Sequence, residues 1–208
     1  MESGKKHTIG GCDIDARNLK TLSGREWLND EIINGYMHLL KERANPPGAP
    51  MKIMMFNSMF RKNLREKGYA GVARWSRRQG AADAAILKLD GIVVPVNNGY
   101  HWTLAYINIK ARRLEYYDSL AGAWSPVSEL REYLKGELKD LYVASEWSDS
   151  NPAGATSPIQ ENGYDCGVFL CKTAEVLTRG GNLDFVQRDI PTIRRIMQLD
   201  LIKGRLDW

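Results

Sequence analysis

The sequence predicts one globular domain that contains both helices and strands, and three observations support this. A chain of 208 residues with 43% apolar and 26% charged residues has the size and composition of a single domain with a sizeable core. Apolar residues recur at helical spacing in stretches near both ends of the chain. Between positions 91 and 117, β-branched and aromatic runs instead have the character of strands.

Residues 1–20 are predicted to be a loosely ordered N-terminal leader. Gly10-Gly11, scattered charges and little periodicity mark this stretch, so no special role is expected for its side chains. The folded domain is expected to span residues 21–208.

The first helix of that domain is expected to begin near Ser23, because Ser23 and Glu26 have capping-box spacing, and to end near Arg43. Three residues fall off its apolar stripe: Trp27, Asn29 and Asp30. They form either a solvated face or a functional surface with an exposed tryptophan.

A proline-rich loop over residues 45–50 precedes a short predicted strand over 52–56. Asn57 is then expected to cap a second helix that ends near Lys67. If the following segment is helical, three arginines share one face: Arg74, Arg77 and Arg78. This face is either simply solvated or suited to an acidic partner.

Three strands are predicted over residues 91–96, 102–109 and 113–117, the second with apolar side chains on both faces. A short polar link joins the last two as a hairpin, which places His101 and Asp118 opposite or diagonal to each other. A carboxylate fixes the tautomer of an imidazole and leaves its other nitrogen for a nucleophile. Without a nucleophile nearby, the two residues would merely end their strands.

Beyond the hairpin, the chain predicts a surface helix over residues 127–142, a further strand over 142–147 and a mobile loop over 148–158. The last helix is expected over 190–206, with Arg194 and Arg195 directed outward.

Residues 160–167 read Gln-Glu-Asn-Gly-Tyr-Asp-Cys-Gly and lead into an apolar segment. They predict a loop that enters a buried helix with Cys166 in its first turn, where free backbone N–H groups and the helix dipole favour thiolate. Asp165 is expected to be the N-cap, and Gln160 can direct its amide N–H₂ at the oxygen of an attacked carbonyl. From this stretch alone, a buried structural cysteine is an equally good interpretation.

Charge and cysteine content narrow the class of protein. A net charge of +4 does not require a nucleic acid partner, although it suits an acidic protein surface. The three cysteines cannot all pair and none has Cys-x-x-Cys spacing, which favours a reducing compartment. No stretch approaches the roughly 20 apolar residues that span a bilayer. We therefore expect a soluble, intracellular protein.

Several motifs together resemble the SUMO-specific cysteine proteases, the ubiquitin-like-protein processing family related to the adenoviral protease. They are Trp27-Leu28-Asn29-Asp30, Phe56-Asn57-Ser58, Gly68-Tyr69 with Val72 to Trp75, His101-Trp102, Tyr117-Asp118-Ser119 and Gln160 to Gly167. They occur in the family's order and at compatible spacings from about Leu22 to Leu201. The resemblance implies an α+β fold of papain-like architecture, a central mixed sheet flanked by helices, and the chain order His, Asp, Cys.

The resemblance also implies roles for four polar residues. Cys166 would attack the carbonyl after the C-terminal Gly-Gly of SUMO, and His101 would act as general base and then general acid. Asp118 would orient His101, while Gln160 and the backbone N–H of Cys166 would hold the oxyanion.

The same resemblance implies a substrate-binding surface. Trp27 and Trp102 would roof a narrow tunnel for the diglycine. The body of the ubiquitin-like protein would contact Asn29, Asp30, Asn57 and Arg74, with Met59 at the edge of that surface in place of the aromatic residue that members often have. The implied partners are SUMO and SUMO-conjugated proteins, without nucleic acid, metal or cofactor, for a monomer in the nucleus or at the nuclear envelope.

Three other functions remain as alternatives. A protease for another ubiquitin-like modifier such as NEDD8 would use the same chemistry with different docking residues. An acetyltransferase of related fold would use the same three residue types but bind acetyl-CoA, and no phosphate-cradling stretch is present. A catalytically inactive SUMO-binding module should have lost one of the four polar residues, and all four are present.

Overall fold

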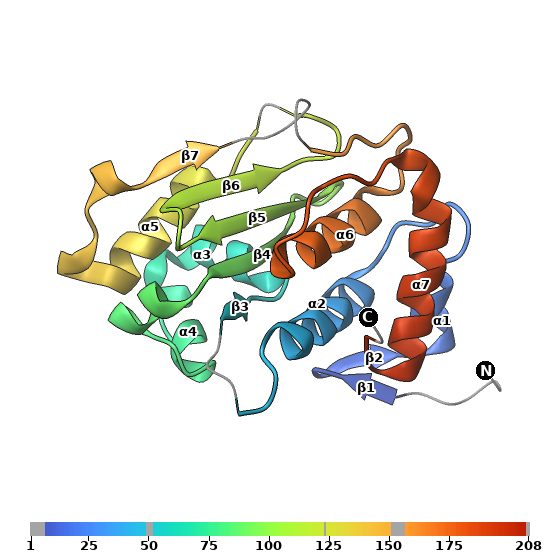
Figure 1. Cartoon of the computed structure of the whole chain (residues 1–208), viewed down its shortest axis with the longest axis horizontal. Helices are drawn as coiled ribbons and strands as arrows, with labels where there is room; N and C mark the ends of the chain where they lie inside the picture. Colours follow the sequence, from blue (N-terminus) through green and yellow to red (C-terminus); the bar gives the residue numbers. More distant parts are fainter. Residues whose placement is uncertain (1–6, 49–51, 123, 151–156, 207–208) are drawn as a thin grey trace.

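A computed structural model describes residues 7–48, 52–122, 124–150 and 157–206. Its centre is a five-stranded mixed sheet in the order β3-β4-β5-β6-β7 (Figure 1). The outer strands run parallel to their neighbours, whereas β4, β5 and β6 are antiparallel. The strands are β3 (Ile53–Met55), β4 (Gly91–Asn97), β5 (Trp102–Asn108), β6 (Arg113–Tyr117) and β7 (Ser148–Ser150).

Helices cover both faces of this sheet, so the predicted α+β class with a flanked central mixed sheet is confirmed. One face packs against α2 (Asp30–Ala44) and α6 (Cys166–Thr178), and the other against α3 (Met59–Lys67) and α5 (Val127–Leu138). The remaining helices are α1 (Ala16–Lys20), α4 (Trp75–Arg78) and α7 (Ile190–Lys203). The shorter 3₁₀ segments are Tyr69–Gly71, Asp83–Lys88, Lys139–Leu141, Ala144–Glu146 and Gln187–Asp189.

The middle strands bury apolar side chains on both faces because they separate two cores. On β4, Val93 joins the core beneath α2 and α6, while Ile92 and Val94 join the core beneath α3 and α5. Leu104 and Ala105 divide in the same way on β5. The predicted internal strand is therefore confirmed.

Residues 7–20 correct the expectation of a loosely ordered leader. They form an antiparallel hairpin of β1 (His7–Ile9) and β2 (Cys12–Ile14), followed by α1. Ile9, Ile14 and Leu19 are buried in the core that contains α2 and α6. Gly10 and Gly11 make the turn at φ values of +58° and +87°, which glycine adopts at little cost. Residues 1–6 lie outside the described ranges.

The helix expected from Ser23 begins seven residues later, at Asp30. Asn29 is its N-cap and accepts a hydrogen bond from the N–H of Ile32 at 3.1 Å. Asp30 and Glu31 complement the helix dipole in the first turn. The cap and these two acids together favour a helix start at Asp30 over a start at the capping box of Ser23. Residues 21–28 consequently form an irregular segment that carries Trp27.

Two other boundaries differ from the prediction. Residues 144–146 form a 3₁₀ turn instead of a strand, and β7 follows at 148–150. Helix α3 begins at Met59 with Ser58 in the N-cap position, so the prediction that Asn57 is the cap is wrong by one residue. The side chain of Asn57 still accepts a hydrogen bond from the N–H of Met59 at 3.0 Å. Most of the expected mobile loop, residues 151–156, lies outside the described residues. Within the described ranges, no helix is long and apolar enough to cross a membrane.

Candidate active site

The β5–β6 hairpin brings His101 and Asp118 together, as the sequence predicts. Leu104 pairs with Tyr117, so the residue before β5 and the residue after β6 lie at the same end of the sheet. His101 Nε2 is 2.6 Å from Asp118 Oδ1. This contact leaves Nδ1 as the imidazole nitrogen available to another partner.

Asp118 is held in its ionised form by hydrogen bonds. Burial by itself would raise its pKa, but the hydrogen bond with His101 and those from the backbone N–H groups of Leu120 and Gly122 lower the pKa below its ordinary value. A Cβ at position 122 would lie 2.7 Å from Asp118 Oδ2, so glycine permits this close approach.

His101 carries a proton at neutral pH. Burial lowers its pKa, but hydrogen bonds with Asp118 and with Cys166 outweigh burial and raise the pKa to about 9. The imidazolium is thus flanked by a carboxylate and by the sulfur of Cys166, an arrangement in which the imidazolium stabilises a thiolate.

Cys166 is the first residue of α6 and is 3% exposed. The helix packs against β5, and the thiol hydrogen-bonds with His101, the residue that precedes this strand. A Cβ at position 167 would lie 2.9 Å from Leu28 Cβ, so Gly167 lets the helix approach the segment that carries Trp27. The thiol therefore sits at a helix N-terminus, among backbone N–H groups suited to an oxyanion.

Asp165 occupies the N-cap position of α6, as predicted, but its side chain does not cap the helix. Its backbone is in the αR region and the carboxylate makes no capping hydrogen bond. Instead, Asp165 accepts hydrogen bonds from three side chains: Asn162, Gln187 and Arg194. Hydrogen bonds with these three side chains take the place of the local cap.

Gln160 is buried and its amide has a defined orientation. Ser119 Oγ donates to Gln160 Oε1 at 2.6 Å, and Gln160 Nε2 donates to the carbonyl oxygen of Asn162 at 2.5 Å. Because Ser119 donates to the oxygen, the amide nitrogen faces the loop before Cys166 and keeps a second hydrogen for another acceptor. Sequence reasoning did not assign this role to Ser119, although the residue lies beside Asp118 in a motif that it singled out.

The two tryptophans of the expected tunnel differ in environment. Trp27 is 49% exposed, and its Nε1 donates to the carbonyl oxygen of Gly163 at 2.8 Å, which sets the indole against the loop before Cys166. Trp102 is 5% exposed within the core, and its Nε1 donates to the carbonyl oxygen of Leu28 at 2.9 Å. Trp102 is thus a core residue in this structure, next to His101 in the chain.

The expected docking residues lie on the surface near α2, α3 and α4, with one exception. Asp30, Asn57, Met59 and Arg74 are exposed. Asn29 is partly buried, and its side-chain atoms bond to the N–H of Ile32 and to Asn18 Oδ1. The structure therefore places Asn29 as a helix cap with internal partners.

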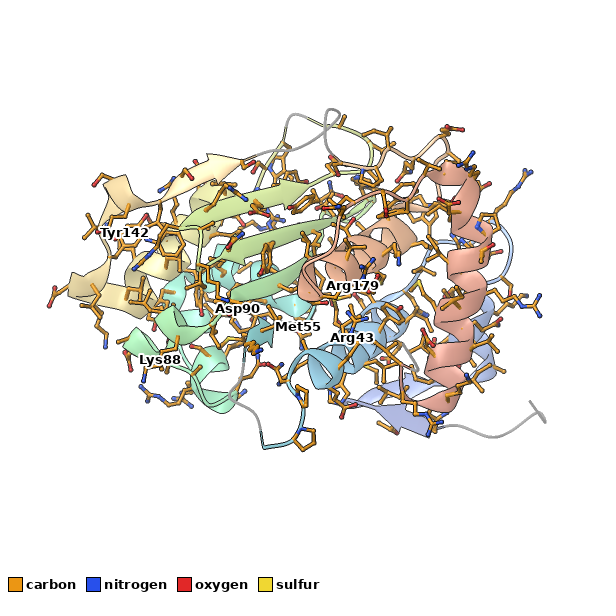
Figure 2. The ribbon with its side chains drawn as sticks, viewed as in Figure 1. Arg43, Met55, Lys88, Asp90, Tyr142 and Arg179 are labelled. Atoms are coloured by element: carbon orange, nitrogen blue, oxygen red, sulfur yellow. The ribbon has the colours of Figure 1, made fainter. Side chains whose placement is uncertain are left out.

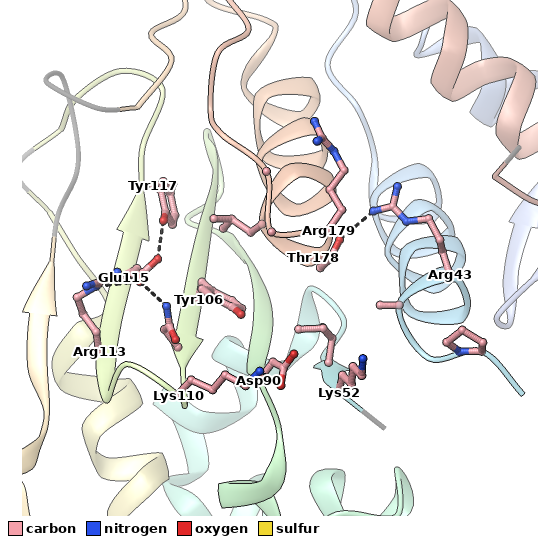
Figure 3. Close-up of a pocket in the computed structure, with 17 residues that line it drawn as sticks. Arg43, Lys52, Asp90, Tyr106, Lys110, Arg113, Glu115, Tyr117, Thr178 and Arg179 are labelled. Atoms are coloured by element: carbon pink, nitrogen blue, oxygen red, sulfur yellow. Dashed lines mark hydrogen bonds and ion pairs between the residues drawn. The ribbon is translucent and has the colours of Figure 1, made fainter. Parts of the chain in front are cut away.

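A cavity of about 930 Å³ lies at the other end of α6 (Figure 3). Arg43 and Arg179, at the ends of α2 and α6, stand on one side of it (Figures 2 and 3). Most of its charged groups are paired: Arg43 and Arg179 with Glu175, Lys110 with Asp90, and Arg113 with Glu115. A 13-residue helix is about 20 Å long, so this cavity is remote from Cys166.

The arrangement around Cys166 is suited to nucleophilic acyl transfer. A thiol stands beside an imidazolium that a carboxylate orients, and an amide and a helix N-terminus supply donors for an oxyanion. Among the described residues, no cluster of histidine, cysteine and acidic side chains is placed to hold a metal ion.

Comparison with known proteins gives a consistent result. Residues 26–205 match the model of the Ulp1 protease family, C-terminal catalytic domain. A Sentrin-specific protease of Caenorhabditis elegans is 38% identical over 196 residues, which cover 93% of this chain and 27% of that protein. Human Sentrin-specific protease 2 is 33% identical over 199 residues, covering 93% of this chain and 33% of that protein. The chain thus spans a third or less of the length of these relatives.

Solved structures share the fold. The catalytic domain of the Chaetomium thermophilum Ulp1-like SUMO protease matches with a TM-score of 0.91 at 29% identity, covering 100% of this chain and 86% of that one. The C-terminal Ulp1 protease domain in complex with Smt3, the yeast ortholog of SUMO, matches with a TM-score of 0.81 at 30% identity, covering 98% and 90%. These matches confirm the fold that the sequence resemblance implied.

Proposed function

The chain belongs to the Ulp1 protease family, and from that premise we propose that it is a cysteine protease that cleaves after the C-terminal Gly-Gly of SUMO. It would mature the SUMO precursor and release SUMO from target lysines. The observation that carries the proposal is the 2.6 Å contact between His101 and Asp118, on an imidazole whose pKa is raised to about 9 by Asp118 and Cys166. This geometry sets an oriented imidazole beside the sulfur of Cys166, which is the arrangement of a cysteine nucleophile with its acid–base partner.

The reaction follows from the positions of these groups. The Cys166 sulfur attacks the carbonyl carbon of the last glycine, and the backbone N–H of Cys166 and Gln160 Nε2 hold the oxyanion. His101 then donates its proton to the leaving nitrogen, which is a peptide amine in the precursor and a lysine amine in a conjugate. The neutral imidazole next activates water, which hydrolyses the thioester and releases SUMO with a free carboxylate.

Substrate selection rests on two surfaces in this proposal. The indole of Trp27, with Trp102 in the core beside His101, limits the space near Cys166 to residues without side chains. The exposed side chains of Asp30, Asn57, Met59 and Arg74 contact the body of SUMO, as the fold match to a protease domain in complex with Smt3 suggests. Asn29 supports this surface as the cap of α2.

The test is cleavage of precursors that extend beyond the Gly-Gly, followed by intact mass. SUMO, NEDD8 and ubiquitin precursors are compared, together with a SUMO conjugate on a target lysine. We expect cleavage after Gly-Gly of both SUMO substrates, with the other two intact. Cleavage of the NEDD8 precursor alone would replace SUMO with that modifier. A folded protein that binds SUMO and leaves every substrate intact would favour a binding module.

The proposal includes three further features. The protein acts as a monomer without nucleic acid, metal or cofactor, which size-exclusion chromatography with light scattering and activity in the presence of chelator can check. Its location in the nucleus or at the nuclear envelope rests on family resemblance. Fluorescence imaging of the tagged protein tests this location.

A further inference from the structure

Arg194 is an arginine of α7 that the sequence predicts to point outward, yet its side chain is only 5% exposed. Arg195, the next residue, is exposed as expected. The guanidinium of Arg194 donates to one carboxylate and to three backbone carbonyls. Nε lies 2.8 Å from Asp165 Oδ1, Nη1 lies 3.0 Å from Thr21 O, and Nη2 lies 3.0 Å from Glu26 O and 3.2 Å from Tyr164 O.

These acceptors belong to two segments that meet at the proposed active site. Thr21 and Glu26 belong to the irregular segment of residues 21–28 that carries Trp27, and Tyr164 and Asp165 immediately precede Cys166. Trp27 Nε1 makes a second connection between the same segments through Gly163 O, at 2.8 Å. Arg194 lies beneath this connection and holds both segments to α7.

The charge of this cluster also bears on Cys166. The carboxylate of Asp165 is only 4% exposed, and Arg194 is the cation that neutralises it, through Nε and through Nη2 at 2.6 Å. Asn162 and Gln187 complete its hydrogen bonds at 2.7 and 2.8 Å. Removing Arg194 would leave a buried negative charge beside a residue that must become a thiolate, and like charges disfavour each other's ionised form.

Arginine suits this position better than lysine does. Its acceptors lie around a planar group, and the rigid fork of a guanidinium can satisfy several at once, whereas an ammonium is a point charge on a flexible stem. A lysine at position 194 could retain the charge opposite Asp165 but not the full set of carbonyl contacts.

We propose that Arg194 is a positioning residue for the reaction, which fixes the loop before Cys166 through Asp165 and Tyr164 and the Trp27 segment through Thr21 and Glu26. The effect of Arg194 on diglycine selection, through the Trp27 segment, rests on the proposed function. The effect of Arg194 on the reactivity of Cys166 does not depend on the proposed function. A purely structural ion pair would affect the free energy of unfolding and leave each folded molecule with unchanged chemistry.

The first experiment measures kcat and KM on the SUMO precursor, corrected for the folded fraction. Arg194→Lys and Arg194→Met are compared with Arg195→Met, an exposed neighbour on the same helix. Misplacement of the attacking atom lowers kcat, so we expect a loss of about 10- to 100-fold for Arg194→Met and a smaller loss for Arg194→Lys. KM should change less than about threefold, because the exposed side chains proposed to contact the body of SUMO make no contact with Arg194, and Arg195→Met should match the parent.

The second experiment needs no substrate. The rate of carbamidomethylation of Cys166 is followed against pH by peptide mass, and Cys12 serves as an internal control because burial and nearby acids raise its pKa to about 11. In Arg194→Met we expect the midpoint for Cys166 to rise by about one pH unit, with partial restoration in Arg194→Lys. Asp165→Asn removes the buried charge and should shift the midpoint less than Arg194→Met does.

The two experiments distinguish failure of the Arg194 proposal from failure of the proposed function. If Arg194→Met melts at lower temperature but keeps the parental kcat and alkylation profile per folded molecule, Arg194 is structural and the proposal is wrong. If the parent cleaves no SUMO substrate, the proposed function fails, while the alkylation profiles still decide the role of Arg194. If Arg194→Met does not fold, Arg194→Lys and Asp165→Asn carry the test, and parental behaviour in both would overturn the proposal.

Discussion

The two ends of α6 each hold a buried carboxylate that pairs with arginine, but the arginines lead to different parts of the molecule. At the N-terminal end, Asp165 pairs with Arg194, and both side chains are 5% exposed or less. At the C-terminal end, Glu175 is fully buried, while its partners are 20–46% exposed: Arg43, Lys172 and Arg179. Burial raises the pKa of Glu175, but hydrogen bonds with Lys172 and Arg43 outweigh burial and hold it below its ordinary value.

This difference indicates what each cluster does. Arg194 continues to the backbone of the segments that carry Cys166 and Trp27. Arg43 instead connects α2 to the last turn of α6, where Nη2 bonds to Glu175 O and Thr178 Oγ1 beside the cavity of Figure 3. Similar ion pairs therefore serve the chemistry at one end of the helix and the packing of two helices at the other.

The largest expected effect is at the N-terminal end, in Cys166→Ser. A hydroxyl is similar in size to a thiol but far less nucleophilic at neutral pH, so turnover of SUMO substrates should be abolished while SUMO binding persists. The matched control is Cys171→Ser on the same helix, which should keep the chemistry because Cys171 lies fully within the core. Equal turnover by Cys166→Ser and the parent would remove the mechanism.

Asp118→Asn should have the next largest effect. An amide cannot stabilise the imidazolium, so kcat should fall by on the order of 10³-fold, with KM little changed. Single-turnover kinetics with excess enzyme and a binding titration measure the two quantities separately. Unchanged kcat in the folded variant would show that His101 needs no carboxylate.

Gln160→Ala should lower kcat by about 10²-fold if the amide holds the oxyanion. Ser119→Ala should act in the same direction but less, because the amide then loses one of the two hydrogen bonds that orient it. Steady-state kinetics on the SUMO precursor give both values. A loss below about threefold for Gln160→Ala would make Gln160 an ordinary loop residue.

Trp27→Ala should change selectivity more than rate. With a smaller side chain over the loop before Cys166, substrates with alanine in place of the penultimate glycine should be cleaved relatively faster. Trp102→Ala is the contrast: truncating this core residue should cost about 3–5 kcal/mol of unfolding free energy, as well as impairing cleavage. Thermal melting measures the loss of stability, and competition cleavage measures discrimination between glycine and alanine at the penultimate position. A folded Trp27→Ala variant that rejects the alanine substrate as strongly as the parent does would exclude Trp27 from substrate selection.

Glu175→Gln should have the smallest effect on activity. It removes the charge opposite three partly exposed cations, so the free energy of unfolding should fall by about 1–3 kcal/mol. Cys166 lies at the other end of the helix, and kcat per folded molecule should stay within about twofold. Denaturant titration with kinetics tests this, and a large loss of kcat at unchanged stability would contradict the division between the two ends.

Sequence reasoning succeeded where a signal is local. The β-branched runs and the short link between them predicted the hairpin, and hence the contact of His101 with Asp118. It missed the hairpin of residues 7–14, because strands of three residues show almost no periodicity. It also predicted, wrongly, that the side chain of Arg194 is directed outward. Three of the acceptors of Arg194 are backbone carbonyls, which have no sequence signature, and the fourth, Asp165, is 29 residues away in the chain.

The central claim, that Cys166 attacks the C-terminal glycine of SUMO, is tested most directly by a trapping measurement. SUMO, NEDD8 and ubiquitin, each with an electrophile at the C-terminus, are incubated with the protein, and the products are analysed by intact mass and peptide mapping. We expect one SUMO added per chain, attached to Cys166, and none in Cys166→Ser or with the other two modifiers. A folded protein that forms no SUMO adduct, or forms it on Cys12, would show that Cys166 is not the nucleophile that attacks SUMO.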